Sequence, residues 1–175
     1  MPLRGAPMFD RIDRLVGGHA FATAMAAGAA LVGITLLTVA SVAGRALIGL
    51  GLGPVPGDYE LVSMTAAFAV TACLPWCQWR RGHVTVDILF QRAGPRTLAA
   101  VDVVANLLMT GAAALIAWRL AAGLSDKYGT AFYRETTFIL QVPVWWGYAA
   151  ALFGAVVFAL VSAWTVVRSI REALR

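Results

Sequence analysis

Two cysteines are the first residues of this chain whose type and spacing could do chemistry. Cys73 and Cys77 are its only cysteines, in the segment Cys-Leu-Pro-Trp-Cys. A redox pair of the thioredoxin kind has two residues between its cysteines, whereas three separate these. They also lie near the end of a long apolar run, on the side that the basic residues described below predict to be cytoplasmic. Thiols stay reduced in the cytoplasm. We expect structural, buried thiols, and a membrane redox protein that uses the pair stays an alternative.

The histidines lie in the wrong places for a haem or metal centre. A bis-histidine haem site needs histidines inside the spans, but the only two in the chain, His19 and His83, lie at membrane edges. His83 and Asp87 have a spacing of four residues, yet no third and fourth ligands accompany them. We therefore expect no cofactor, no metal and no catalytic residue, and we do not expect an enzyme.

Arg45 and Glu60 are charged residues at the ends of apolar runs. An ionisable group in a span costs about 2.5–3.5 kcal/mol at the centre, so it usually has a partner or a function. A hairpin brings Arg45 and Glu60 to the same outer face, where they could pair. Alternatively, each side chain reaches water separately, or Glu60 is the proton-coupling carboxylate of an autonomous small exporter. Its shallow depth argues against that last role.

The segment that follows the second apolar run is the most charged part of the chain. Arg80, His83 and Asp87 are spaced i, i+3 and i+7, next to Arg81. If the helix continues through Gly82, they share one face and could form a charge network that orders this segment. The simpler interpretation is an ordinary basic loop next to the membrane.

The elements that must position these residues are four long apolar runs, at residues 20–43, 59–79, 98–121 and 143–167. About 20 apolar residues cross the roughly 30 Å hydrocarbon core of a bilayer as a helix. The chain is 60% hydrophobic and 13% charged, whereas soluble domains are about 25% charged. We predict an all-α integral membrane protein: a single domain over residues 1–175, with four transmembrane helices and short interfacial helical segments. Residues 9–16 are expected to be one such interfacial helix.

The basic residues predict the orientation of these helices. Ten of the fourteen Lys and Arg residues lie before the first run, between the second and third, or after the fourth. By the positive-inside rule, both termini are then cytoplasmic. The net charge of +5 therefore reflects topology and contact with anionic lipid, and we expect no nucleic-acid partner.

Aromatic residues mark both ends of the fourth run. Trp145, Trp146 and Tyr148 lie near its outer end, and Trp164 lies near its inner end. Trp145 and Trp164 are 19 residues apart, or about 28 Å along a helix axis. This distance matches one bilayer, so we predict that the four side chains are membrane-interface anchors.

The order of these motifs resembles a known family. Two elements carry the resemblance most strongly: Glu60-Leu61, and then, after about twenty apolar residues, Arg81-Gly82-His83-Val84-x-Val86-Asp87. They resemble the signature of the small membrane subunit, the DctQ-like subunit, of tripartite ATP-independent periplasmic (TRAP) transporters. Arg45 and the segment Thr137-x-x-x-Gln141-Val142-Pro143 are also similar to that family. The resemblance covers residues 9–170.

The resemblance implies partners rather than an active site. It implies an accessory subunit in the bacterial inner membrane that supports a large TRAP membrane subunit. Together they would take up an organic acid with sodium, after a periplasmic substrate-binding protein has captured it. The candidate site residues would then serve assembly, and they are Arg45, Glu60, Arg80, Arg81, His83 and Asp87. The exporter that uses Glu60 and the redox protein that uses Cys73 and Cys77 are the competing hypotheses.

Overall fold

The structure is a computed structural model, and it describes residues 7–82, 94–128 and 135–174 of the chain. The elements in chain order are α1 (Pro7–Ala46), the 3-10 turn η1 (Ile48–Leu50), α2 (Asp58–Trp79), α4 (Pro95–Tyr128) and α5 (Trp145–Ala173). Four of these helices are long and apolar enough to cross a membrane. The predicted all-α membrane fold is therefore confirmed.

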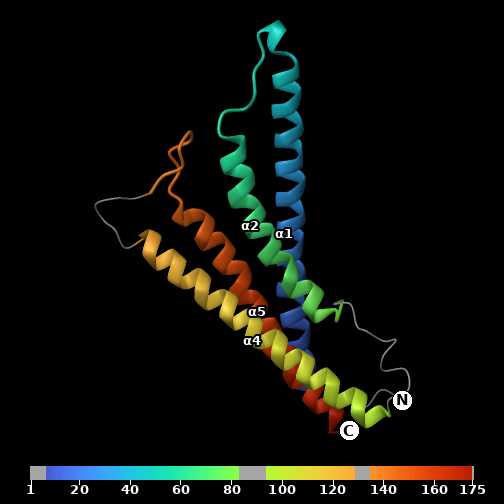
Figure 1. Cartoon of the computed structure of the whole chain (residues 1–175). Coiled ribbons are helices and arrows are strands. Elements are labelled where there is room, and N and C mark those ends of the chain that lie inside the picture. Colours follow the sequence, from blue (N-terminus) through green and yellow to red (C-terminus); the bar gives the residue numbers. More distant parts are fainter. Residues whose placement is uncertain (1–6, 83–93, 129–134, 175) are drawn as a thin grey trace.

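The two ends of the molecule carry different parts of the chain (Figure 1). The start of α1 and the end of α5 lie together at one end, which we call the termini end. The opposite end carries the α1–α2 connection, residues 47–57, and the loop 135–144 that leads into α5. We call this the hairpin end.

The helices pack in a spatial order that differs from their order in the chain. α2 lies between α1 and α5, and α4 packs against the other side of α5. In Figure 1 the α1–α2 pair and the α4–α5 pair cross toward the termini end and separate toward the hairpin end. The domain is therefore an open arrangement of two helix pairs, joined through the contact of α2 with α5.

Small residues allow α2 and α5 to cross closely. A Cβ atom added to Gly154 would lie 2.5 Å from the Thr71 Oγ1 atom and 2.8 Å from the backbone nitrogen of Ala72. Ala151 and Ala155, on either side of Gly154, are also buried. Transmembrane helices use such residues because no hydrophobic effect drives them together in lipid, so they depend on close packing.

α1 is longer than predicted because its first turns are held by tertiary contacts. Its 40 residues span about 60 Å, roughly twice the hydrocarbon thickness of a bilayer. Residues 9–16 are helical as predicted, and they continue without a break into the first span. Gly17 does not interrupt the helix, because it packs against α2: a Cβ there would lie 2.7 Å from the ring of Trp79.

Candidate functional site

Glu60, in the first turn of α2, binds the loop that precedes α5. One carboxylate oxygen accepts the backbone N–H of Ile139 at 2.7 Å, and the other accepts that of Leu140 at 2.9 Å. The Leu140 side chain lies against Gly57, where a Cβ atom would overlap it and where the φ angle is 74°. Hydrogen bonds to a charged acceptor are stronger than neutral ones. Glu60 therefore fixes this loop to the start of α2.

The loop 135–144 is also closed by its own backbone hydrogen bonds. A β-bridge joins Thr136 to Pro143, and two further backbone hydrogen bonds flank it. Because Pro143 takes part in the bridge, α5 begins at Trp145, two residues later than the predicted span. Phe138, at the tip, is 93% exposed. The loop thus presents one aromatic side chain on a fixed backbone.

The expected ion pair between Arg45 and Glu60 is not among those of the described residues. Asp58 instead connects the first two helices: it accepts hydrogen bonds from the Ser41 hydroxyl of α1 and from the backbone N–H of Tyr59. The positive charge of Arg45, at the end of α1, also attracts this carboxylate. Sequence reasoning missed Asp58, although an acidic residue in the first turn of a helix is favoured by the helix dipole.

α2 ends in a capping motif with an arginine at the position where glycine is usual. Arg81 has a φ angle of 52°. The backbone N–H of Gly82 donates to the carbonyl of Cys77 at 2.8 Å, and that of Arg81 donates to the carbonyl of Gln78 at 3.0 Å. This pair of hydrogen bonds defines a Schellman motif, whose left-handed residue is most often glycine. The motif stops the helix after Trp79.

The condition set for a shared helical face of Arg80, His83 and Asp87 is not met. It required α2 to continue through Gly82, and the cap ends the helix before that residue. His83 and Asp87 themselves lie outside the described residues. The guanidinium of Arg80 lies over the ring of Trp76, 5.6 Å from the ring centroid, which is a cation–π distance.

Arg81 joins three helices at the termini end. Its Nη2 atom lies 2.6 Å from Glu172 Oε2 on α5 and 3.7 Å from Asp102 Oδ2 on α4. Arg168 lies near the other Glu172 oxygen, at 3.8 Å. Exposed ion pairs contribute about 0.2–1 kcal/mol each. The cluster therefore sets the position of the end of α2 more than it stabilises the fold.

A buried polar cluster lies next to Arg81, between α2, α4 and α5. The Gln78 amide nitrogen donates to Asn106 Oδ1 at 2.9 Å and to Thr165 Oγ1 at 2.8 Å. The Asn106 amide nitrogen donates to Ser169 Oγ at 2.9 Å and to the carbonyl of Asp102 at 2.8 Å. Gln78 is only 3% exposed. Removing one partner from such a buried network costs about 1–3 kcal/mol.

Sequence reasoning missed this cluster. A signal was present on α5, because Ser162, Thr165 and Ser169 recur at i, i+3 and i+7 and so share one face. Gln78 Oε1 and Ser162 Oγ are buried there without a protein hydrogen-bond partner among the described residues. Buried polar atoms of this kind usually bind ordered water.

The first turns of α1 are attached to the inner half of α5. The indole N–H of Trp164 donates to Asp13 Oδ1 at 2.9 Å, and Arg168 lies 3.6 Å from the same oxygen. The ring of Phe9 lies 4.8 Å from that of Trp164, and the Arg171 guanidinium lies 4.2 Å from the centroid of Phe9. Trp164, predicted as a membrane anchor, is thus half-buried against the start of α1.

The other three predicted anchors lie at the hairpin end. Trp146 is 56% exposed. Trp145 is half-buried against the ring of Tyr128, with centroids 5.4 Å apart. Tyr148, on α5, is half-buried because its ring packs against Gly123 of α4. A Cβ added to Gly123 would lie only 2.6 Å from that ring. Trp146 therefore has the greatest exposure of these three side chains.

Comparison with known families assigns the chain. The profile of "Tripartite ATP-independent periplasmic transporters, DctQ component" matches residues 34–172 of the 175. The chain belongs to the DctQ family. The resemblance found in the sequence motifs is thereby confirmed. Comparison with curated proteins gives no match, and comparison with solved structures gives none either.

The DctQ match contains most of the contacts described above. It includes both the Glu60 contact with the loop 135–144 and the Arg81 cluster with Glu172. It begins after the first turns of α1, so the contact of Asp13 with Trp164 has one partner outside the match. As a component of TRAP transporters, the chain works with other subunits.

The two cysteines of this DctQ chain lie on α2. Cys73 and Cys77 form no disulfide with each other, and both are partly buried. The carbonyl of Cys77 serves the α2 cap.

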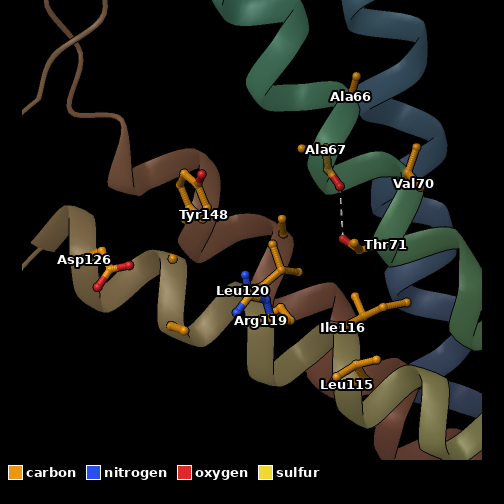
Figure 2. A pocket seen from close by; sticks show the side chains of 13 residues that line it. Ala66, Ala67, Val70, Thr71, Leu115, Ile116, Arg119, Leu120, Asp126 and Tyr148 are labelled. Carbon is orange, nitrogen blue, oxygen red and sulfur yellow. Dashed lines mark hydrogen bonds between the residues drawn. The ribbon is translucent and has the colours of Figure 1, made fainter.

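A groove opens between α2 and α4 in the half of the DctQ domain nearer the hairpin end (Figure 2). Its volume is about 840 Å³, and α5 contributes Tyr148 and Ala151. Its α4 wall includes Leu115, Ile116, Arg119 and Asp126. A second cavity of about 360 Å³ shares several of these residues and extends the groove along the start of α5. Sequence reasoning did not find the groove, because it depends on the angle between the helix pairs.

Proposed function

We propose that this chain is the small scaffold subunit of a TRAP-type secondary transporter. It supports a large membrane subunit during sodium-coupled uptake of an organic acid, which a periplasmic substrate-binding protein delivers. The family assignment supports this role, because DctQ is a component of multi-subunit transporters. The acid is selected by the partners, and this chain contributes position and stability within the membrane.

One structural observation carries the scaffold role: polar groups within the helices are used to hold helices together. Gln78 on α2 donates hydrogen bonds to both Asn106 on α4 and Thr165 on α5. Glu60, at the start of α2, is used to hold a loop. A polar group that fixes helix positions in this way provides rigidity, which is what a scaffold requires.

The proposed orientation places the termini end in the cytoplasm of a bacterium and the hairpin end in the periplasm. Arg11, Arg14 and Arg80 are exposed at the termini end, as the positive-inside rule requires of a cytoplasmic face. The loop with Phe138 then faces the compartment through which the binding protein arrives. Its fixed backbone gives it a low entropy cost on binding.

The contacts favour this role over the two alternatives. A proton-coupling carboxylate must be free to bind and release a proton during each cycle. Both oxygens of Glu60 instead accept backbone N–H groups, and protonation would weaken those hydrogen bonds. Cys77 takes part in the cap of α2 through its carbonyl, which gives its segment a structural role independent of its thiol.

The experiment is deletion of this chain from cells that keep the other two subunits. We expect sodium-dependent uptake of the organic acid to vanish and to return when the full chain is supplied on a plasmid. The full chain should also co-purify with the large membrane subunit in mild detergent. Uptake that persists after deletion would contradict the proposal.

Two variants separate the alternatives, the first in the same uptake assay and the second in liposomes. Cys73→Ala combined with Cys77→Ala should restore full uptake, which a redox mechanism does not allow. In liposomes that contain this chain alone, we expect no proton-driven export of cationic drugs. Export that is lost in Glu60→Gln would establish the exporter instead.

A further inference from the structure

We propose that the groove between α2 and α4 binds one zwitterionic phospholipid, with its acyl chains in the apolar part and its headgroup between Arg119 and Asp126. The proposal requires only that the chain spans a bilayer. It does not depend on the transporter role or on which end faces the cytoplasm.

The groove changes from apolar to charged along α4. Leu115 and Ile116 line its deeper part, and Arg119 and then Asp126 follow toward the hairpin end (Figure 2). The wall on α2 is formed by small and apolar side chains, including Ala66, Ala67 and Val70, so it offers hydrocarbon contact. Arg119 lies near the end of the apolar run of α4. The charges are therefore at the depth where lipid headgroups begin.

The order of the two charges matches one class of lipid. A zwitterionic phospholipid presents acyl chains, then an anionic phosphate, then a cationic amine, in that order from the bilayer centre toward water. The groove presents apolar side chains, then the cation Arg119, then the anion Asp126. The two residues are seven positions apart, or about 10 Å along the axis. An arginine and a carboxylate can therefore bind the phosphate and the amine of the same headgroup.

Both charged side chains are available for such contacts. Arg119 and Asp126 are exposed, and neither makes a hydrogen bond or an ion pair with the parts of the chain that the structure describes. A guanidinium is a preferred partner for phosphate, since it donates several hydrogen bonds in a fixed plane. Basic positions between transmembrane helices bind lipid headgroups for this reason.

A phospholipid fits this groove better than a helix from a partner protein. A helix that filled it would need an acidic side chain at the headgroup depth to match Arg119 and a basic one beyond it to match Asp126. A zwitterionic phospholipid carries both charges in that order.

The test measures lipid retention by the isolated full chain with native mass spectrometry. The purified chain is exchanged into detergent with equal amounts of phosphatidylethanolamine and phosphatidylglycerol that carry the same acyl chains. We expect one phosphatidylethanolamine to be retained several-fold more than phosphatidylglycerol, which has a phosphate but no amine. Arg119→Gln should lower retention of both lipids about tenfold, since it removes a charged hydrogen-bond donor. Asp126→Asn should lower retention of phosphatidylethanolamine alone, so that the preference disappears.

The matched control is Arg11→Gln, an exposed arginine at the termini end, which should change neither lipid. Ala67→Leu, which narrows the groove without changing its charge, should lower retention of both. Circular dichroism and size-exclusion chromatography establish that each variant is folded, and Arg119→Lys should retain more lipid than Arg119→Gln. Equal retention of the two lipids by the unchanged protein would overturn the proposal. So would an Arg119→Gln variant that keeps its lipid but no longer co-purifies with the large subunit, because the groove would then bind protein.

Discussion

The guanidinium of Arg81 lies 2.6 Å from the carboxylate of Glu172, a residue 91 positions further along the chain. This contact joins the end of α2 to the end of α5. It forms although Arg81 has a left-handed backbone conformation, with a φ angle of 52°. For residues other than glycine this conformation is unfavourable, because Cβ approaches the carbonyl oxygen. The side-chain contact and the backbone preference therefore oppose each other at this position.

The first prediction uses that opposition. Arg81→Gly and Arg81→Ala both lose the contacts with Glu172 and Asp102. Only glycine adopts the left-handed backbone conformation without strain. We expect Arg81→Gly to have a free energy of unfolding about 1 kcal/mol higher than Arg81→Ala, measured by denaturation in mixed detergent micelles. Arg80 has a φ angle of −77°, so Arg80→Gly should be no more stable than Arg80→Ala. Equal stability of the two Arg81 variants would contradict the role assigned to the cap.

The second prediction concerns the carboxylate that holds the loop. Glu60→Ala removes both acceptors for the backbone N–H groups of Ile139 and Leu140. We expect hydrogen–deuterium exchange to become at least about fivefold faster at these two amides, because opening of the loop is then easier by about 1 kcal/mol or more. Tyr59→Phe is the control, since the Tyr59 side chain is exposed and its ring is preserved. Unchanged exchange in Glu60→Ala would show that the loop closes without Glu60.

The third prediction tests the crossing of α2 and α5. Gly154→Ala would place a methyl group 2.5 Å from Thr71 Oγ1 and 2.8 Å from a backbone nitrogen, so the helices would have to separate. Such overpacking costs about 1–3 kcal/mol. Gly111→Ala is the matched control in α4, because a Cβ there meets nothing within 4 Å. It should be neutral or slightly stabilising, since alanine is the better helix former. A Gly154→Ala variant as stable as the unchanged protein would disprove the close approach.

The fourth prediction concerns the buried polar cluster. Gln78→Leu should lower the free energy of unfolding by about 1–3 kcal/mol, because it leaves Asn106 Oδ1 buried without its donor. Asn106→Leu should have a cost of similar size. The double variant should cost less than the sum of the two, since a pair of apolar side chains leaves fewer polar groups unsatisfied. Additive effects in unfolding experiments would mean that the two side chains are not coupled.

Several features could be predicted from the sequence because they depend on local composition. Runs of 21 to 25 apolar residues specify helices of membrane length, and each of the four predicted spans corresponds to a long helix of the structure. The motif that begins at Arg81-Gly82-His83 was specific enough to indicate the family. These signals are read within one segment, so no knowledge of how the helices pack is required.

Two expectations from local patterns did not hold. Arg80, His83 and Asp87 would share a helical face only if α2 continued through Gly82, but α2 ends in a cap before that residue. Likewise, Arg45 and Glu60 are close in sequence and opposite in charge, yet Glu60 contacts residues 79 and 80 positions away. A carboxylate binds whichever hydrogen-bond donors the fold places next to it. The sequence near Glu60 does not indicate that these donors are backbone N–H groups of a loop so far along the chain.

The sequence by itself determined how many helices are long and apolar enough to cross a membrane and which family the chain resembles, because hydropathy and motif spacing act over short stretches of chain. Only the tertiary structure decided which polar groups meet, such as Gln78 with Thr165 across 87 positions, and where the groove beside Arg119 opens. Both depend on the angles at which the helices cross. Those angles follow from close contacts such as that of Gly154 with Thr71, whose partners lie on different helices.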